Sequence, residues 1–211
     1  MGSEKWSFDK EAATWDQNPL RVKLASDIAN AISVERMLTS DMDILELGCG
    51  TGLLTLQLQP LARSVTGVDS SEGMLGVLRA KIANQNLTNV RTQLLHVENG
   101  DVLQGSYHLV VCSMTLHHVR EIEPLLDQFH KVTTPGGYLC IADLDPDNGQ
   151  FHGENDTVFH WGFDRAALRR VFVQAGFDDI QDRTAADVTK PTPDGGKRSF
   201  SVFLMTGRKR S

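Results

Sequence analysis

Short apolar runs alternate along the chain with segments in which apolar side chains recur every three or four positions. The apolar runs predict five strands, at residues 43–47, 65–69, 90–95, 109–113 and 138–142. Helical spacing between these runs predicts three helices, over residues 53–61, after Ser71, and over residues 122–129. Strands that alternate with helices over about 100 residues favour a parallel sheet covered by helices on both faces.

The segments on either side of this alternating region complete the predicted fold. The N-terminal 40 residues show one helical apolar stripe, formed by Ala25, Ile28, Ala29 and Ile32. A further helix is predicted to begin near Asp164. Segments around Ile180 and over 200–205, on either side of the turn-rich residues 191–196, could pair antiparallel at the sheet edge. We therefore expect an α/β fold, a Rossmann-like sheet of seven mostly parallel strands with helices on both faces and one reversed strand near the C-terminal edge.

Composition narrows the classes of partner and compartment. The chain has 211 residues, 40% of them apolar, and its 21 Lys and Arg against 27 Asp and Glu give a net charge of −6. A negative balance argues against a nucleic-acid partner, because neutralisation of phosphates supplies most non-specific affinity. No apolar run approaches the roughly 18 residues that a membrane span requires, so no membrane insertion is expected. The N-terminus also lacks the apolar segment of a secretory signal.

The cysteines support the same picture. Cys49, Cys112 and Cys140 lie in apolar or glycine-rich stretches, at a spacing that suits no zinc site. Buried free thiols are typical of a reducing compartment. We therefore expect a cytoplasmic protein without a metal site.

A glycine loop follows the first predicted strand and precedes a predicted helix. Gly48, Gly50 and Gly52 allow a tight turn and close approach of a ligand, and a helix start offers free N–H groups. Three glycines at this spacing are common by chance. The next strand, however, ends in Asp69, where an acid can accept hydrogen bonds from both hydroxyls of a ribose. The combination predicts a site for a cofactor that contains a nucleoside.

Two residues help to choose among such cofactors. The dinucleotide fingerprint requires a glycine where Leu53 stands, and Glu46 would repel a pyrophosphate but attract a cation. S-adenosylmethionine carries a sulfonium and an ammonium group and no phosphate. The sequence therefore favours S-adenosylmethionine, and a nicotinamide-dependent oxidoreductase is the less favoured alternative.

Four motifs occur in the order found in a known family. Residues 46–52 (ELGCGTG), 68–69 (VD), 116–119 (LHHV) and 135–139 (PGGYL) resemble those of class I S-adenosylmethionine-dependent methyltransferases. The resemblance extends over roughly residues 8–182 and is nearest the broad group that includes the ubiquinone and menaquinone biosynthesis methyltransferases. It implies methyl transfer from S-adenosylmethionine to a small-molecule acceptor, with S-adenosylhomocysteine as the product. A non-catalytic S-adenosylmethionine-binding protein is the alternative, and the oligomeric state stays open.

The resemblance also implies which residues bind the cofactor. The backbone of Gly48 and Gly50 would lie against its methionine part, with Glu46 nearby, and Asp69 would hold the ribose. Members of the family usually have an acid that accepts a hydrogen bond from the adenine amine. In this sequence His96 or Glu98 would make that contact, with Val97 between them. The remaining implied contacts are Trp15 as a cover, with Arg21 as a second candidate, Ser70 and Met74 along the adenosine, and Ser113 beside the methyl donor.

Histidines are the candidate bases for an acceptor that must lose a proton. His118 follows the fourth predicted strand, where capping of that strand is an equal alternative, and for His117 the structural role is favoured. His152 and His160 lie in the segment that builds the acceptor pocket in similar proteins, although loop histidines are more often merely solvated. His118, His152 and His160 are therefore the candidate catalytic residues. Asp143 and Asp145 follow the fifth predicted strand and would face the same crevice.

These assignments divide a single predicted methyltransferase domain, residues 1–211, into three parts. Residues 1–40 would form a helical lid, residues 41–143 the cofactor-binding core, and residues 144–211 an acceptor-side loop, helix and edge strands.

Overall fold

The computed structural model describes residues 7–34, 38–152, 156–192 and 195–210. Parts of three predicted segments lie outside the described residues: 1–6 and 35–37 of the lid, 153–155 of the acceptor-side loop, and 193–194 of the turn.

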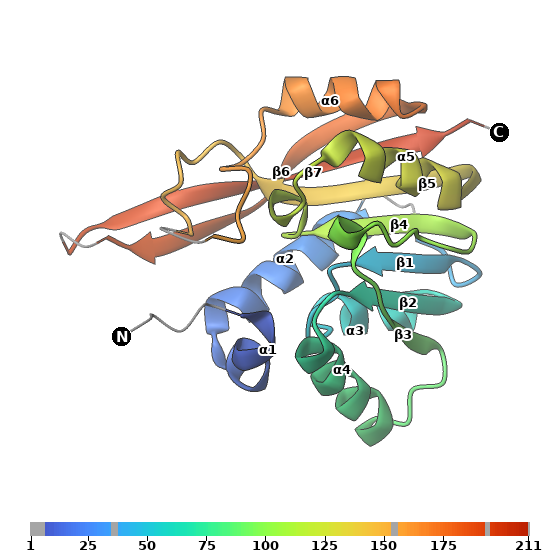
Figure 1. The fold of residues 1–211 in the computed structure, drawn as a ribbon, viewed down its shortest axis with the longest axis horizontal. Helices are drawn as coiled ribbons and strands as arrows, with labels where there is room; N and C mark the ends of the chain where they lie inside the picture. Colours follow the sequence, from blue (N-terminus) through green and yellow to red (C-terminus); the bar gives the residue numbers. More distant parts are fainter. Residues whose placement is uncertain (1–6, 35–37, 153–155, 193–194, 211) are drawn as a thin grey trace.

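One sheet of seven strands runs through the molecule in the order β3-β2-β1-β4-β5-β7-β6 (Figure 1). Among the described strands, β7 alone runs antiparallel to its neighbours, β5 and β6, so the prediction of a mostly parallel sheet with one reversed strand is confirmed. The strands are β1 (Asp43–Leu47), β2 (Ser64–Asp69), β3 (Val90–Leu94), β4 (Tyr107–Ser113), β5 (Thr133–Leu144), β6 (Phe177–Pro191) and β7 (Lys197–Lys209).

The helices cover both faces of this sheet, as predicted (Figure 1). Side chains of α5 and α6 pack on one face with Val110 and Cys112, and those of α2 and α3 pack on the other with Leu109 and Val111. This alternation follows from the period of two along a strand. The α-helices are α1 (Phe8–Glu11), α2 (Pro19–Val34), α3 (Thr55–Leu58), α4 (Glu72–Asn84), α5 (Ile122–Val132) and α6 (Arg165–Gln174). The 3-10 helices are η1 (Ala12–Gln17), η2 (Gln59–Leu61), η3 (Val97–Asn99) and η4 (Leu116–His118).

Local hydrogen bonds set the starts of the helices that the sequence placed. Ser71 caps α4 by accepting a bond from the Met74 backbone N–H (3.1 Å), and Asp164 caps α6 by accepting one from Ala167 (2.7 Å). The predicted apolar stripe of α2 is buried. None of the described helices is long and apolar enough to cross a membrane.

The extents of several elements differ from the predictions. The helix predicted over 53–61 is wrong in its extent, since α3 begins only at Thr55 and a 3-10 turn containing Pro60 follows it. The edge strands β6 and β7 are much longer than the apolar segments around Ile180 and 200–205, because backbone pairing continues through polar residues as far as Pro191 and Lys197. They form a hairpin that extends beyond the other strands (Figure 1).

Candidate functional site

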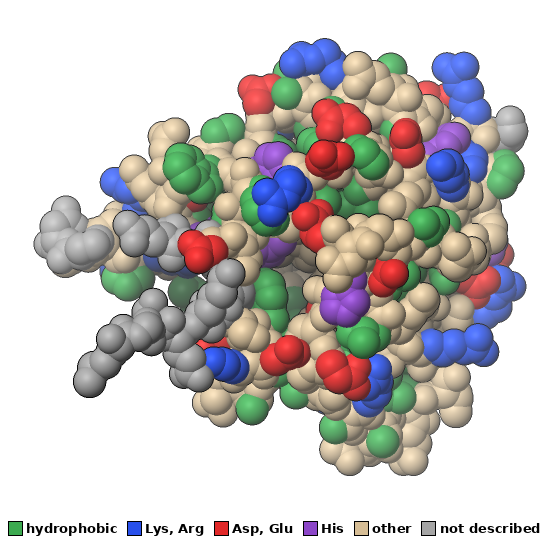
Figure 2. All heavy atoms as spheres, viewed as in Figure 1, with side chains coloured by type: hydrophobic (Ala, Val, Ile, Leu, Met, Phe, Trp, Pro, Cys, Tyr) green, Lys and Arg blue, Asp and Glu red, His purple; other side chains and the backbone are tan. Residues whose placement is uncertain are grey.

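A cavity of about 440 Å³ lies at the carboxyl ends of the strands, between the N-terminal segment and the sheet. Figure 2 shows the surface hollowed near the middle of the view, with hydrophobic side chains and a histidine at its border. In open α/β sheets this edge is where ligands bind. The cavity is lined by all the predicted cofactor residues, Trp15, Glu46, Gly48, Gly50, Asp69, Ser70, Met74, His96, Val97, Glu98 and Ser113.

The glycine loop connects β1 to α3 and approaches the cavity with its backbone. Gly48, Gly50 and Gly52 have φ values of +74°, +53° and +84°, a region that side chains with a Cβ rarely adopt. A Cβ added at Gly48 would lie 1.9 Å from the Thr115 hydroxyl oxygen. The loop is held by β2, because the N–H groups of Gly48 and Cys49 both donate to the Val68 carbonyl (2.8 and 3.1 Å). Only glycine fits at position 48.

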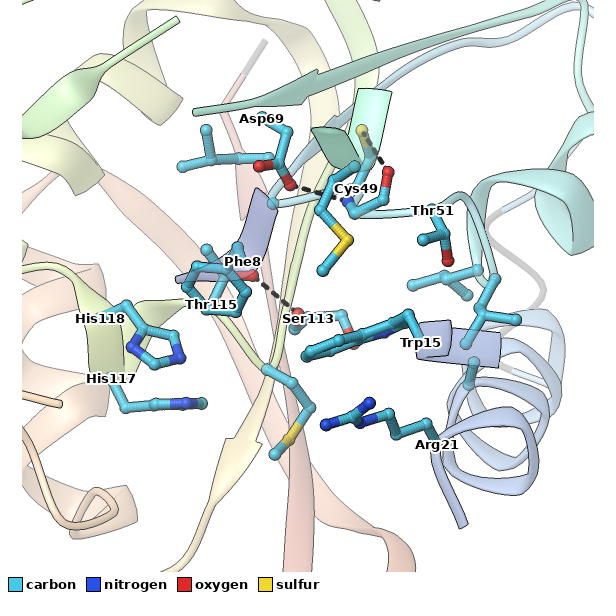
Figure 3. Close-up of a pocket in the computed structure, with 18 of the residues that line it drawn as sticks. Phe8, Trp15, Arg21, Cys49, Thr51, Asp69, Ser113, Thr115, His117 and His118 are labelled. Carbon is cyan, nitrogen blue, oxygen red and sulfur yellow. Dashed lines mark hydrogen bonds between the residues drawn. The ribbon is translucent and has the colours of Figure 1, made fainter. Parts of the chain in front are cut away.

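Asp69 ends β2 with its carboxylate against the glycine loop (Figure 3). One oxygen accepts a bond from the Gly50 N–H (2.7 Å) and the other accepts one from the Ser71 N–H (2.8 Å). Burial raises the pKa of this carboxyl, although the backbone N–H groups around it act in the opposite direction. Each oxygen keeps a further lone pair, so the carboxylate can still accept hydrogen bonds from two neighbouring hydroxyls.

Glu46 on β1 is the buried acid at the other end of the loop. Its side chain is 2% exposed and accepts a hydrogen bond from the Thr55 hydroxyl (2.5 Å). Burial, together with the like charge of Asp69, raises the pKa of Glu46 to about 8. The hydrogen bond from Thr55 acts in the opposite direction. The carboxyl is therefore mostly neutral at pH 7, and a ligand cation beside it would favour ionisation.

The N-terminal segment covers the cavity and is bonded to the elements beneath it. Asp9 accepts bonds from the Ser71 hydroxyl (2.6 Å) and the Gly73 N–H (2.8 Å), and Asp16 accepts one from the Thr51 hydroxyl (2.5 Å). These bonds place the Trp15 ring over the loop, and the Arg21 guanidinium stacks on that ring at 3.6 Å (Figure 3).

The far end of the cavity is lined by His96, Val97 and Glu98, after β3. The Glu98 carboxylate accepts a bond from the Arg120 N–H (3.0 Å), which fixes its position at the rim. Both alternatives for an adenine contact, His96 and Glu98, therefore lie at the same end of the cavity, and the choice between them stays a prediction.

Three histidines gather on the side of the cavity opposite Trp15. The His117 ring lies 4.2 Å from that of His118 and 4.6 Å from that of His152, between ring centroids. Figure 3 shows His117 and His118 facing Trp15 and Arg21 across the pocket. His160 is not among the lining residues, and its Nε2 donates to the Val119 carbonyl (2.9 Å). His118 and His152, two of the three predicted catalytic histidines, thus line the cavity. His117 lies between them in the same wall.

Sequence reasoning favoured a structural role for His117, and the structure places its ring in the cavity lining. Its Nδ1 lies 2.7 Å from Asp143, and its Nε2 is buried without a hydrogen-bond partner among the described residues. The nearest signal in the sequence was the position of Asp143 at the end of the fifth predicted strand. His117 and Asp143 meet because the fourth and fifth strands are neighbours in the sheet. Local sequence patterns do not predict which strands are neighbours.

The remaining wall of the cavity is apolar with one further cation. Lys190, on β6, donates to the Phe151 carbonyl (2.8 Å) and lies 3.5 Å from the centroid of the Phe151 ring. Burial lowers the pKa of this lysine, and the charge of Arg21 lowers it further. The apolar lining here includes Leu24, Ile28, Met114 and Val188.

No group of three or more His, Cys, Asp or Glu side chains in the described part of the chain could hold a metal ion. All three cysteines are buried, and none of them forms a disulfide bond.

Known methyltransferases resemble this chain in sequence and in fold. A family described as "Methyltransferase domain" matches residues 44–137, which span the sheet from β1 into β5 and include the glycine loop and Asp69. The N-methyltransferase NodS of Bradyrhizobium japonicum, solved with S-adenosylhomocysteine, superimposes with a TM-score of 0.71 at 15% identity, covering 97% of each chain. The chain thus resembles a methyltransferase domain over residues 44–137 and has the fold of solved S-adenosylmethionine-dependent methyltransferases.

Relatives by sequence agree with this class. An uncharacterized methyltransferase of Schizosaccharomyces pombe is 27% identical over 191 residues, covering 83% of this chain and 66% of that protein. A ubiquinone biosynthesis O-methyltransferase of Pseudomonas aeruginosa is 26% identical over 129 residues, covering 61% of this chain and 52% of the relative. The matched region thus spans about half to two thirds of these curated relatives.

The cavity fits S-adenosylmethionine, the cofactor of this class. The backbone of Gly48 and Gly50 lines the cavity, Asp69 has lone pairs for two ribose hydroxyls, and Glu46 can pair with an ammonium group. Bound there, S-adenosylmethionine supplies an electrophilic methyl group.

Proposed function

We propose that this protein transfers the methyl group of S-adenosylmethionine to a small-molecule acceptor, and that the cofactor residues named above hold the donor. The observation that carries the proposal is one continuous cavity with two chemically different ends. Gly48, Gly50 and Asp69 lie at one end, and the histidines with Lys190 lie at the other. Transfer requires both reactants in one enclosed space with water excluded.

The acceptor end supports a small organic molecule. Its wall is formed by apolar side chains and Phe151, and it holds polar groups at a few positions only. Such a pocket binds by apolar burial and orients the ligand through its few polar contacts. A non-catalytic S-adenosylmethionine-binding protein would have no need for a second end lined with basic side chains.

Calorimetric titration of the wild type with S-adenosylmethionine, S-adenosylhomocysteine and NADH tests the cofactor assignment. We expect saturable binding of the two sulfur nucleosides and none of NADH. Asp69→Ala should weaken binding at least tenfold, because two hydrogen bonds to a charged group are lost. The matched control is Asp178→Ala, at a half-buried carboxylate outside the cavity lining that pairs with Arg210 (2.6 Å).

Methyl transfer from labelled donor to a panel of phenols, amines and thiols then tests catalysis. A wild type that binds the donor and methylates nothing in a broad panel would favour the non-catalytic alternative. Binding of NADH in preference to the sulfur nucleosides would refute the cofactor assignment.

A further inference from the structure

His117 and Asp143 form a buried pair at the ends of two neighbouring strands. Asp143 is 0% exposed and His117 is 1% exposed. The His117 Nδ1 lies 2.7 Å from Asp143 Oδ1, and the Asp143 carboxylate also accepts bonds from the backbone N–H groups of His117 (3.3 Å) and Leu144 (2.8 Å). Burial alone would raise the pKa of Asp143, but the His117 ring and these bonds lower it below its usual value.

The ionised carboxylate determines which nitrogen of His117 carries the proton. A carboxylate only accepts hydrogen bonds, so Nδ1 donates and Nε2 keeps its lone pair. Nε2 is buried and has no hydrogen-bond partner among the described residues. Buried polar atoms are nearly always bonded. Because His117 lines the cavity and its ring points into it (Figure 3), this nitrogen is placed to meet a ligand atom.

The Nε2 of His152 is also buried without a hydrogen-bond partner among the described residues, but neither of the other two histidines of the cluster is bonded to a carboxylate there. The Nδ1 of His118 donates to the Thr157 carbonyl (2.7 Å), which is not a charged partner. Burial and the neighbouring His117 lower the pKa of His118 to about 4, and burial with the charges of His117, His118 and Lys190 lowers that of His152 to about 3. Both rings are therefore weak bases near neutral pH.

We propose that His117 is the catalytic base, that Asp143 is its positioning residue, and that the acceptor therefore presents a neutral O–H or N–H group. This inference rests on the proposed methyl transfer. The acceptor's oxygen or nitrogen forms its bond to the methyl carbon while the carbon–sulfur bond breaks, and its proton passes to Nε2. The sulfonium becomes the neutral thioether of S-adenosylhomocysteine. The imidazolium, paired with Asp143, returns the proton to water once the products leave.

The groups facing His117 come from three parts of the chain. Asp143 approaches from β5, His118 is its neighbour in η4, and His152 belongs to the segment after β5, within reach of the Lys190 charge on β6. Of these groups, Asp143 alone is an acid, so it alone can accept a hydrogen bond from Nδ1 and stabilise a positive charge on the ring.

A direct test measures proton transfer without turnover. The protein saturated with S-adenosylhomocysteine is titrated with 4-nitrophenol and 4-nitrocatechol, at a pH one unit below the pKa of each free probe. We expect the visible phenolate band to appear on binding to the wild type, and its amplitude to fall at least tenfold in His117→Asn. His118→Asn should lower the band much less than His117→Asn does. His130→Asn, on α5 and outside the cavity lining, is the matched control.

The kinetic test uses the phenols and amines that the wild type methylates. His117→Asn should lower kcat about a hundredfold or more, with the loss shrinking for acceptors of lower pKa that ionise without help. Asp143→Asn should lower kcat and shift the pH profile, because an amide can donate to Nδ1 and so select the wrong tautomer. Binding of S-adenosylhomocysteine should be unchanged in both variants, which shows that they fold.

Several outcomes would overturn the proposal. They are a wild type that binds neither probe, a bound probe that keeps its neutral spectrum, and a His117→Asn enzyme that transfers methyl groups at the wild-type rate. Loss of the phenolate band in His118→Asn rather than in His117→Asn would also refute it. These results differ from a failure of the proposed function, in which the wild type itself binds no sulfur nucleoside or transfers no methyl group.

Discussion

Replacing Glu46 by Gln removes a buried acid while keeping its shape and the oxygen that accepts the Thr55 hydroxyl bond. Burial raises the pKa of Glu46 from 4.5 to about 8. Between these two values the folded protein holds a proton that the unfolded chain has released. The unfolded state therefore binds fewer protons, and the free energy of unfolding falls as the pH rises through this window.

The size of the effect follows from the two pKa values. The difference between 4.5 and about 8, at about 1.4 kcal/mol per pH unit, corresponds to about 5 kcal/mol. The contribution of Glu46 to the free energy of unfolding of the wild type falls by this amount as the pH rises from 4.5 to the folded-state pKa of about 8. Above that pKa the loss is complete. Glu46→Gln should thus match the wild type near pH 4.5 and exceed it by several kcal/mol at pH 8.

Urea unfolding of both proteins without ligand, at pH 5, 6, 7 and 8, measures this difference. Asp69 and Cys49 face Glu46 and are present in both proteins, so subtracting one curve from the other isolates the glutamate and its coupling. Glu121→Gln, at an exposed position, is the control and should follow the wild type throughout. A stability difference that is independent of pH, or that shrinks as the pH rises, would refute the reasoning.

Three further predictions concern the ligands. Wild-type affinity for S-adenosylmethionine should increase as the pH rises toward 8, because the cation favours the ionised form of Glu46, and calorimetry on Glu46→Gln should show weaker binding without this pH dependence. Gly48→Ala should lower the free energy of unfolding in urea by about 2 kcal/mol or more and abolish detectable donor binding, because the added Cβ would collide with Thr115. An unchanged affinity would contradict the role of the glycine loop in donor binding. Lys190→Met should weaken binding of 3,4-dihydroxybenzoate about tenfold and leave catechol unaffected, and equal losses for the two probes would exclude an ionic contact.

Local patterns were enough to predict the sheet and the residues that line the cavity at the glycine loop. The period of two or of 3.6 residues determined which segments form strands and helices, because each must bury one face. Gly48, Gly50 and Asp69 could be assigned because their requirements are local: a turn, a helix start and the end of the next strand. Where polar residues continue an element, as at the tips of β6 and β7, hydrophobic periodicity carries no signal, and their extents were underestimated.

The acceptor side was decided by the tertiary structure. Consecutive histidines, His117 and His118, are equivalent in sequence, yet strand order places the Asp143 carboxylate against one of them, 26 residues away along the chain. Likewise, the fold brings His152 and Lys190 to the same wall from a loop and an edge strand. The chemistry of a side chain depends on burial and on the charges beside it, and these arise from long-range contacts that local sequence patterns do not specify.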